Sequence, residues 1–273
     1  MGEELAWGRR YLLCPPEHFA VAYEINPWMA TGAEVDRARA RAQWDELKAA
    51  LEEAGATVEV QPPDPTVPDL VFTANAGIVS GRAFVPSEFR HPERQPETAL
   101  DIAWFEARGY EVRRLSGDVD HEGAGDALPF GGVLVSGYRF RSDAAAHAQL
   151  SKLLGVAVRS VELVDPRYYH LDITFCPLDS TRAILWPGAW DVYGRRVMEA
   201  LVPEPLVLEP EEAGRFVANS VVVGRTVLMP TCPPRVGRRL EAWGFTPVEL
   251  DVSEFLKAGG ACRCLTLALD VTL

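Results

Sequence analysis

The feature of this sequence that most restricts its fold is a phrase that recurs five times along 273 residues. Each copy is a short polar loop that leads into a β-hairpin pattern, and the residues at the loop-to-strand junctions are Asn75, Asp126, Asp172, Asn219 and Cys264. The junctions lie roughly 45 to 51 residues apart, at the upper edge of the repeat periods of propeller-like architectures. We therefore expect five equivalent structural units.

Between the hairpins the sequence shows a second repeated pattern, in which a helical segment closed by Gly or Pro is followed by a β-rich run. These segments are residues 33–60, 96–115, 142–164, 192–210 and 233–250. The unit is therefore expected to be hairpin, helix and strand. We expect the N-terminal strand RRYLLC to complete the last hairpin and close a ring. Because no Pro/Gly/Ser linker interrupts the five units, residues 1–273 are expected to form a single domain.

In such a ring the junction residues of all five units point to one central cavity. Strand alternation in Cys264-Leu265-Thr266-Leu267 would place the Cys264 side chain on the face opposite the two leucines. The sequence thus predicts a polar, titratable centre.

Composition narrows the classes of partner. A formal net charge of -12 argues against a nucleic-acid binder, which normally displays a basic face, so we expect a small-molecule substrate. No stretch approaches about 18 uninterrupted apolar residues, and the first residues do not resemble a secretory signal. Five cysteines without a disulfide-dense framework are expected to be reduced thiols. Together these features predict a cytoplasmic protein without a membrane partner.

Four motifs, in this order and spread over nearly the whole chain, resemble one family: PDLVFTANAG, HEGAGDAL, YYHLDITFCPL and GGACRCLTL. They are similar to motifs of the amidinotransferase, arginine deiminase and dimethylargininase superfamily. The resemblance implies an α/β fold, the five-bladed α/β-propeller called the pentein fold. It also implies a hydrolase of guanidino compounds that needs neither a metal nor another cofactor.

The resemblance further implies roles for individual residues. Cys264 is the expected nucleophile, His170 the general acid/base, Glu122 the partner that orients His170, and Asp172 a ligand of the guanidinium group. The other expected substrate ligands are Asn75, Asn26 and Asp126, with Arg90 and Arg141 for the carboxylate of an amino acid.

The residues themselves fit this chemistry. A guanidinium carbon is a poor electrophile, so attack on it needs a strong nucleophile, a grip on the cation and a proton for the departing amine. Carboxylates match the planar N–H fork of a guanidinium, and a bound cation favours the thiolate of a cysteine. We expect a covalent thiouronium intermediate on Cys264 that water, activated by His170, hydrolyses.

Asn75 stands where deiminases carry an Asp, and this departure bears on the product. Together with Asn26 in INPWM, it looks more like the arginine dihydrolase branch, which takes arginine to ornithine, carbon dioxide and ammonia. A neutral amide can accept from a guanidinium N–H and can also donate to a ureido oxygen. We therefore hypothesise that Asn75 lets the site turn over twice.

Several alternatives stay open at this stage. The activity could instead be that of a dimethylargininase, an arginine deiminase or an amidinotransferase. A non-catalytic binding protein is a further possibility, since the same architecture occurs in a ribosome anti-association factor. Cys262 is the alternative nucleophile, and the Cys-x-Cys spacing does not suit structural zinc. Asp126 and Asn219 could hold turns instead of touching the substrate, and for Asn219 we prefer the turn.

Overall fold

The computed structural model describes residues 2–273, in which five separate three-stranded sheets form, one for each predicted unit. The first two sheets are β3 (Gly77–Ser80), β4 (Ala83–Pro86) and β5 (Glu111–Val112), then β6 (Ala127–Phe130), β7 (Val133–Tyr138) and β8 (Val158–Glu162). The next two are β9 (Phe175–Pro177), β10 (Arg182–Leu185) and β11 (Glu204–Val207), then β12 (Val221–Val223), β13 (Thr226–Met229) and β14 (Thr246–Glu249). The fifth sheet joins β1 (Arg10–Leu13), β2 (Thr57–Val60) and β15 (Leu267–Ala268).

All five sheets are built in the same way. An antiparallel pair is followed by a helix, and the strand after the helix pairs in parallel with the middle strand. The connecting helices are α1 (Arg37–Glu53), α2 (Glu97–Glu106), α3 (Ala144–Leu154), α4 (Val192–Leu201) and α6 (Pro234–Ala242). The predicted order of hairpin, helix and strand is therefore confirmed in every unit.

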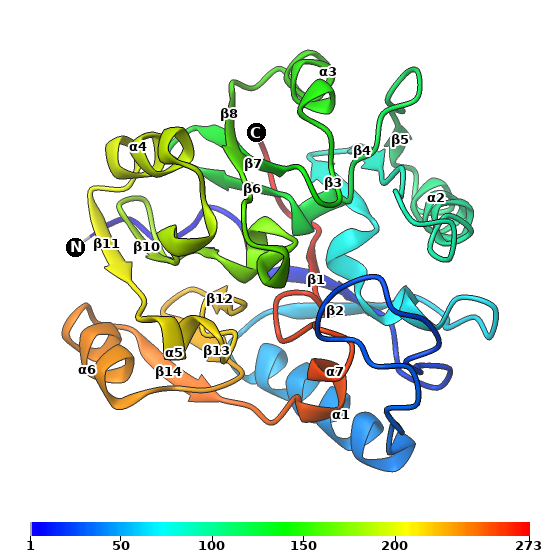
Figure 1. Cartoon of the computed structure of the whole chain (residues 1–273), viewed down its shortest axis with the longest axis horizontal. Helices are drawn as coiled ribbons and strands as arrows, with labels where there is room; N and C mark the ends of the chain where they lie inside the picture. Colours follow the sequence, from blue (N-terminus) through cyan, green and yellow to red (C-terminus); the bar gives the residue numbers. More distant parts are fainter. Residues whose placement is uncertain (1) are drawn as a thin grey trace.

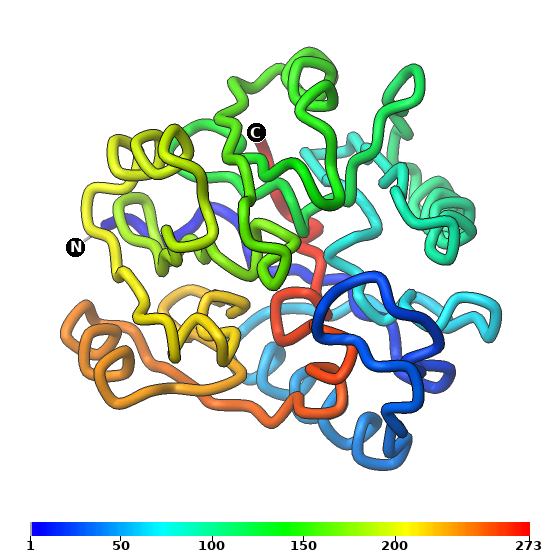
Figure 2. The backbone as a smooth tube through the Cα atoms, in the orientation of Figure 1, coloured from blue at the N-terminus to red at the C-terminus, as the bar shows by residue number. Residues whose placement is uncertain are grey.

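The two ends of the chain meet in one sheet, as predicted. Strand β1 pairs antiparallel with β15, with Tyr11 opposite Ala268, and parallel with β2, with Arg10 opposite Thr57. Figure 1 shows the sheets around a common centre with the five connecting helices toward the outside, and Figure 2 shows the C-terminal segment running through that centre. The N-terminal and C-terminal segments are thus held together by backbone hydrogen bonds within the fifth sheet.

Helix α1 shows how a connecting helix buries one apolar face. In α1, Trp44, Leu47 and Leu51 are buried at a spacing of three and four residues, as an amphipathic helix requires. The side chain of Asp36 accepts a hydrogen bond from Arg39 N and so caps the first turn of this helix. No helix within residues 2–273 has both the length and the hydropathy needed to cross a membrane.

Some local features differ from the prediction. Two short helices, α5 (Pro210–Ala213) and α7 (Ser253–Leu256), were not expected, because four residues are too few to show a periodicity. The prediction that strand alternation orients Cys264 is wrong, because β15 begins only at Leu267 and Cys264 lies in the preceding turn. The local backbone of this turn therefore fixes the thiol's direction.

Candidate active site

The five junction loops surround the centre of the molecule and are hydrogen-bonded to one another. Each loop is linked to the next, and the last is linked back to the first. The donors and acceptors are Asn75 Nδ2 to Glu122 O, Leu171 N to Asp126 Oδ1, Asn219 Nδ2 to Asp172 O, Arg263 N to Asn219 Oδ1, and Ala74 N to Cys264 O. This cycle holds the polar side chains of all five units in a fixed relation.

Cys264 lies in a buried turn closed by a hydrogen bond from Leu265 N to Ala261 O. Its Sγ is 3.1 Å from Asn219 Nδ2, which donates to it, and 3.5 Å from Asp172 Oδ2. Burial and the neighbouring Asp172 raise the pKa of the Cys264 thiol well above its ordinary value. Without a substrate the sulfur is therefore a neutral thiol at neutral pH.

His170 and Glu122 form a buried pair, and neither is among the residues that line the cavity at Cys264. The imidazole Nε2 donates to Glu122 Oε2 at 2.8 Å, and Arg141 Nη1 donates to the same oxygen at 2.8 Å. Burial lowers the pKa of His170 to about 4 in spite of this hydrogen bond. Burial would raise the pKa of Glu122, but Arg141 and His170 hold it well below its usual range. A neutral imidazole thus stands beside an ionised carboxylate.

Asp172 lies completely buried, in the 3-10 turn Leu171–Ile173. Burial raises its pKa to about 7, although Arg263, Cys264 and Asn219 act in the opposite direction. Its Oδ1 receives no hydrogen bond from any residue that the structure describes. Asp172 is not among the residues that line the cavity at Cys264.

Two buried arginines face the same cavity as Cys264, which supports a site for a carboxylate. They are Arg141 and Arg94, and the second is not the arginine expected from the sequence. Arg90 lies outside the cavity, where its guanidinium pairs with Asp120 and Asp143 near the surface. The expectation for Arg90 is therefore corrected to Arg94, four residues further along the chain.

Arg94 is fixed by a network that also fixes Asn75. Its Nε and Nη2 each donate to the Glu97 carboxylate at 2.8 Å, and its Nη1 donates to Asn75 Oδ1 at 2.8 Å. The amide of Asn75 therefore presents its oxygen to Arg94 and its nitrogen to Glu122 O. Asp69, which was not singled out from the sequence, also lines the cavity, and its Oδ1 has no donor within residues 2–273.

A loop near the N-terminus covers the cavity. Ile25, Asn26 and Met29 line it together with Cys264. Asn26 Nδ2 donates to Ala258 O, and its Oδ1 accepts from the backbone of Trp28, so both ends of the amide hold the loop in place. The free volume of this cavity is only about 10 Å³, which is too small for an amino acid, so lining groups must move for one to enter.

The remaining candidates divide between framework and site. Ser142 Oγ and Leu171 N donate to the two carboxylate oxygens of Asp126, so the framework already uses both oxygens. Asn219, for which a turn was preferred, contacts the thiol directly, and its repeat-equivalent position was the available signal. Cys262 is fully buried in the apolar core and is absent from the cavity wall.

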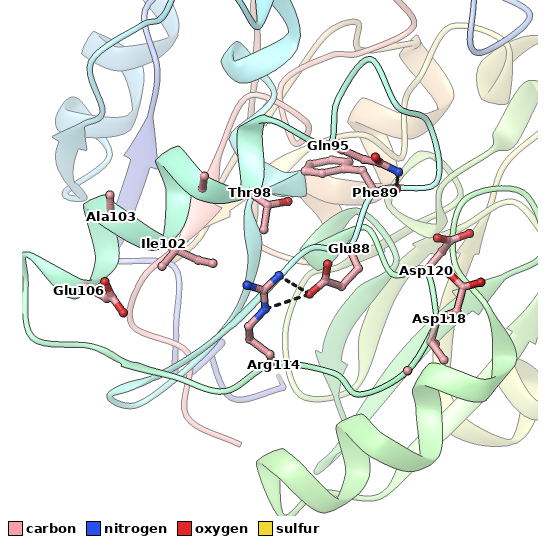
Figure 3. Close-up of a pocket in the computed structure, with 13 residues that line it drawn as sticks. Glu88, Phe89, Gln95, Thr98, Ile102, Ala103, Glu106, Arg114, Asp118 and Asp120 are labelled. Carbon is pink, nitrogen blue, oxygen red and sulfur yellow. Dashed lines mark hydrogen bonds and ion pairs between the residues drawn. The ribbon is translucent and has the colours of Figure 1, made fainter.

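A much larger groove lies elsewhere on the molecule. It has a volume of about 610 Å³ and runs between α2 and the segment 114–120, with Arg114 pairing with Glu88 across it (Figure 3). Its walls carry carboxylates but neither a thiol nor an imidazole. In the described part of the chain, no three His, Cys, Asp or Glu side chains are grouped so as to hold a metal ion.

Comparison with known proteins gives strong matches, although no family model matches the chain. The chain is 44% identical over 263 residues to the bifunctional arginine dihydrolase/ornithine cyclodeaminase AgrE of Nostoc sp. (strain PCC 7120). This alignment covers 94% of the chain but only 37% of AgrE. It is 40% identical over 261 residues to N(G),N(G)-dimethylarginine dimethylaminohydrolase of Mycobacterium tuberculosis, with 96% of this chain and 86% of that protein covered.

Among solved structures, the chain is similar to the N-terminal domain of ArgZ, an arginine dihydrolase from cyanobacteria, in a cysteine-to-serine mutant bound to its substrate. The TM-score is 0.93 at 40% identity, and the match covers 96% of this chain and 98% of that one. The match thus covers 98% of that N-terminal domain of ArgZ but only 37% of the full-length protein AgrE.

Proposed function

Because this chain belongs to the family of cysteine-dependent amidine hydrolases that contains dimethylarginine dimethylaminohydrolase and the dihydrolase domain of ArgZ, we propose that it hydrolyses free L-arginine. The preferred products are ornithine, carbon dioxide and ammonia. In this proposal residues 1–273 act as one catalytic domain on a small-molecule substrate without a cofactor. Its five cysteines are free thiols, which fits the reducing cytoplasm expected from the sequence.

One observation carries the proposal: four buried carboxylate oxygens have no protein donor within residues 2–273, and three of them belong to the central loops. These three are Asp172 Oδ1, Glu122 Oε1 and Asp69 Oδ1, whereas the fourth, Asp101 Oδ2, lies in α2. Arginine brings two cationic groups, a guanidinium and an ammonium, and buried carboxylates need such partners. Arg94 and Arg141 supply the positive charge for its carboxylate. The site therefore matches each charged group of free arginine.

We assign Cys264 as the nucleophile and His170 as the general acid/base. The bound guanidinium places positive charge beside the sulfur, so the thiol can transfer its proton to the neutral imidazole. The thiolate attacks the guanidinium carbon, the imidazolium protonates one terminal nitrogen, and the C–N bond breaks with release of ammonia. A thiouronium on Sγ remains, with Asp172 and Glu122 against its nitrogens.

Water completes the first turnover. Neutral His170 takes a proton from the water, and the oxygen adds to the thiouronium carbon. The C–S bond then breaks, the thiol is restored, and the surplus proton leaves with ammonia as ammonium, so that the product is citrulline. The same steps on the ureido carbon would release a second ammonia and a carbamate of ornithine, which decomposes to ornithine and carbon dioxide.

Asn75 is the residue to which we assign the second turnover. A ureido oxygen is an acceptor, and an ionised Asp in this position would repel it, whereas an amide does not. Because Arg94 holds the Asn75 oxygen, the amide NH₂ group is the part that can turn toward the substrate, at the expense of its 3.3 Å hydrogen bond to Glu122 O.

Product analysis tests the proposal. The full chain is incubated separately with arginine, citrulline, dimethylarginine and agmatine, and products are identified by chromatography. We expect arginine to give ornithine. Agmatine should not be turned over, because it has no carboxylate for Arg94 and Arg141, and Cys264→Ser should be inactive. Full turnover by Cys264→Ser would refute the mechanism.

A second candidate function, dimethylarginine hydrolysis, is favoured by one specific finding. The dimethylarginine dimethylaminohydrolase of Mycobacterium tuberculosis matches this chain over 86% of its own length. In the same incubation, that activity would give dimethylamine and citrulline from dimethylarginine and would leave arginine unchanged.

A further inference from the structure

A closed ring of hydrogen bonds joins the Glu122–His170 pair to two residues that the proposed reaction does not use. Its members are each at most 1% exposed: Glu122, His170, Leu171, Asp126 and Ser142. His170 Nε2 donates to Glu122 Oε2 at 2.8 Å, and the next residue donates from Leu171 N to Asp126 Oδ1 at 2.9 Å. Ser142 Oγ donates to Asp126 Oδ2 at 2.6 Å and accepts from Glu122 N at 3.1 Å, which closes the ring.

Ser142 is placed to fix Glu122 from both ends. It follows Arg141, whose Nη1 donates to Glu122 Oε2 at 2.8 Å, while the Ser142 hydroxyl accepts from the backbone N–H of Glu122. A hydrogen bond of 2.8 Å from Arg139 N to Ser142 O fixes the backbone of this segment. Two consecutive residues therefore hold the carboxylate and the backbone of Glu122.

Asp126 holds the other member of the pair through the peptide group that follows His170. Both of its carboxylate oxygens are engaged, so the side chain cannot turn without breaking a contact. Gly137 makes room for it, because a Cβ atom at position 137 would stand 2.8 Å from Asp126 Oδ1. Gly137 N also donates to Asp126 O at 2.8 Å, which fixes the backbone from which the carboxylate projects.

A general acid/base must stay within hydrogen-bond reach of the group whose proton it moves, and buried polar neighbours can hold it there. We propose that Asp126 and Ser142 are positioning residues that together hold Glu122 and His170 in their working geometry. This inference rests on the proposed function, in which His170 is the general acid/base. It gives Asp126 a role other than the substrate contact expected from the sequence.

The expected consequence is a loss of rate without a loss of binding. His170 moves protons both in C–N cleavage and in the activation of water, so a displaced imidazole slows each step that we assign to it. A misplacement of about 1 Å can cost about 100-fold in rate. Arg94, which we assign to the substrate carboxylate, is fixed by Glu97 outside the ring, so KM should change little.

The test compares variants that break the ring with variants that spare it. Ser142→Ala and Asp126→Leu each remove two of its contacts. In Asp126→Asn the amide oxygen still accepts from Leu171 N, and the NH₂ group can donate to Ser142 Oγ, which has a second lone pair. Ser136→Ala is the matched control, because Ser136 is completely buried in β7 of the same unit and its Oγ has no hydrogen-bond partner within residues 2–273.

Initial rates at varied arginine concentration separate kcat from KM. We expect kcat to fall by about 10- to 100-fold in Ser142→Ala and Asp126→Leu, with KM within about threefold of the wild type. Asp126→Asn and Ser136→Ala should keep kcat within about threefold. Rescue by the amide would show that the contacts of Asp126, and not merely the filling of its space, support the rate.

A second readout needs no substrate. In unliganded protein labelled with ¹⁵N-histidine, the Nε2–H signal of His170 is identified by its absence in His170→Gln. Ser142→Ala and Asp126→Leu should shift this signal and speed the exchange of its proton with solvent, whereas Asp126→Asn and Ser136→Ala should not. This result supports the proposal even if the chain does not hydrolyse arginine, which would overturn only the proposed function.

Three outcomes would overturn the role of the two residues. One is an unchanged His170 signal in folded Ser142→Ala and Asp126→Leu. Another is a rise in KM at unchanged kcat, or an equal loss of kcat in Ser136→Ala, since the ring would then have no particular part in the chemistry. If neither Ser142→Ala nor Asp126→Leu folds while Asp126→Asn folds but is inactive, the ring serves folding and the assignment is wrong.

Discussion

Asn75 is the residue whose substitution most sharply tests how the two ends of the site are coupled. In Asn75→Asp the new carboxylate would stand 2.8 Å from Arg94 Nη1, where the amide oxygen now accepts. The variant also loses the donor to Glu122 O. Arg94 is already paired with Glu97, so a second carboxylate would leave it little positive charge for the substrate.

The magnitude follows from the hydrogen bond that the substrate would lose. A hydrogen bond between Arg94 and the substrate carboxylate is charge-assisted, and such bonds contribute about 1.5–3 kcal/mol. Its loss corresponds to an increase in KM for arginine of about 10- to 150-fold. The carboxylate should also repel the ureido oxygen, so the ratio of citrulline to ornithine should rise.

The assay is a series of initial rates at varied arginine concentration, with both products quantified. Asn75→Leu is the control, because it removes the amide hydrogen bonds without adding a charge, and its KM should rise much less. Equal KM values for Asn75→Asp and Asn75→Leu would refute the charge argument. An unchanged product ratio in Asn75→Asp would show that Asn75 does not govern the second turnover.

Two further substitutions test separate parts of the structure. Arg94→Met should raise KM for arginine by about tenfold or more, whereas Arg90→Met, near the surface, should leave KM within about twofold. The reverse result would show that Arg90 binds the substrate carboxylate, as expected from the sequence. Asp101 is completely buried, and burial raises its pKa to about 7. Between its unfolded pKa near 4 and pH 7, the folded protein therefore holds a proton that the unfolded chain releases. The stability of the folded protein falls as pH rises through this range. In urea unfolding, Asp101→Asn should therefore gain stability over the wild type from pH 4.5 to pH 7.5, by up to about 4 kcal/mol, and a constant difference would contradict the buried-acid interpretation.

Much of the fold was predictable because each unit repeats the same local signals. Hairpin, helix and strand each have their own period in the sequence, and five copies reinforce one another. The short helices α5 and α7 and the turn at Cys264 were missed, because segments of about four residues carry no period. Motif register favoured Cys264 over Cys262, and the structure places Cys264 alone of the two at the cavity.

The sequence by itself determined the number of units, their order and the kinds of side chain at the centre, since these depend on local patterns and residue chemistry. Only the tertiary structure decided which arginine faces the cavity, because Arg90 and Arg94 lie in one loop and packing alone turns the second inward. The same holds for Asn219, which meets Cys264 across 45 residues of sequence.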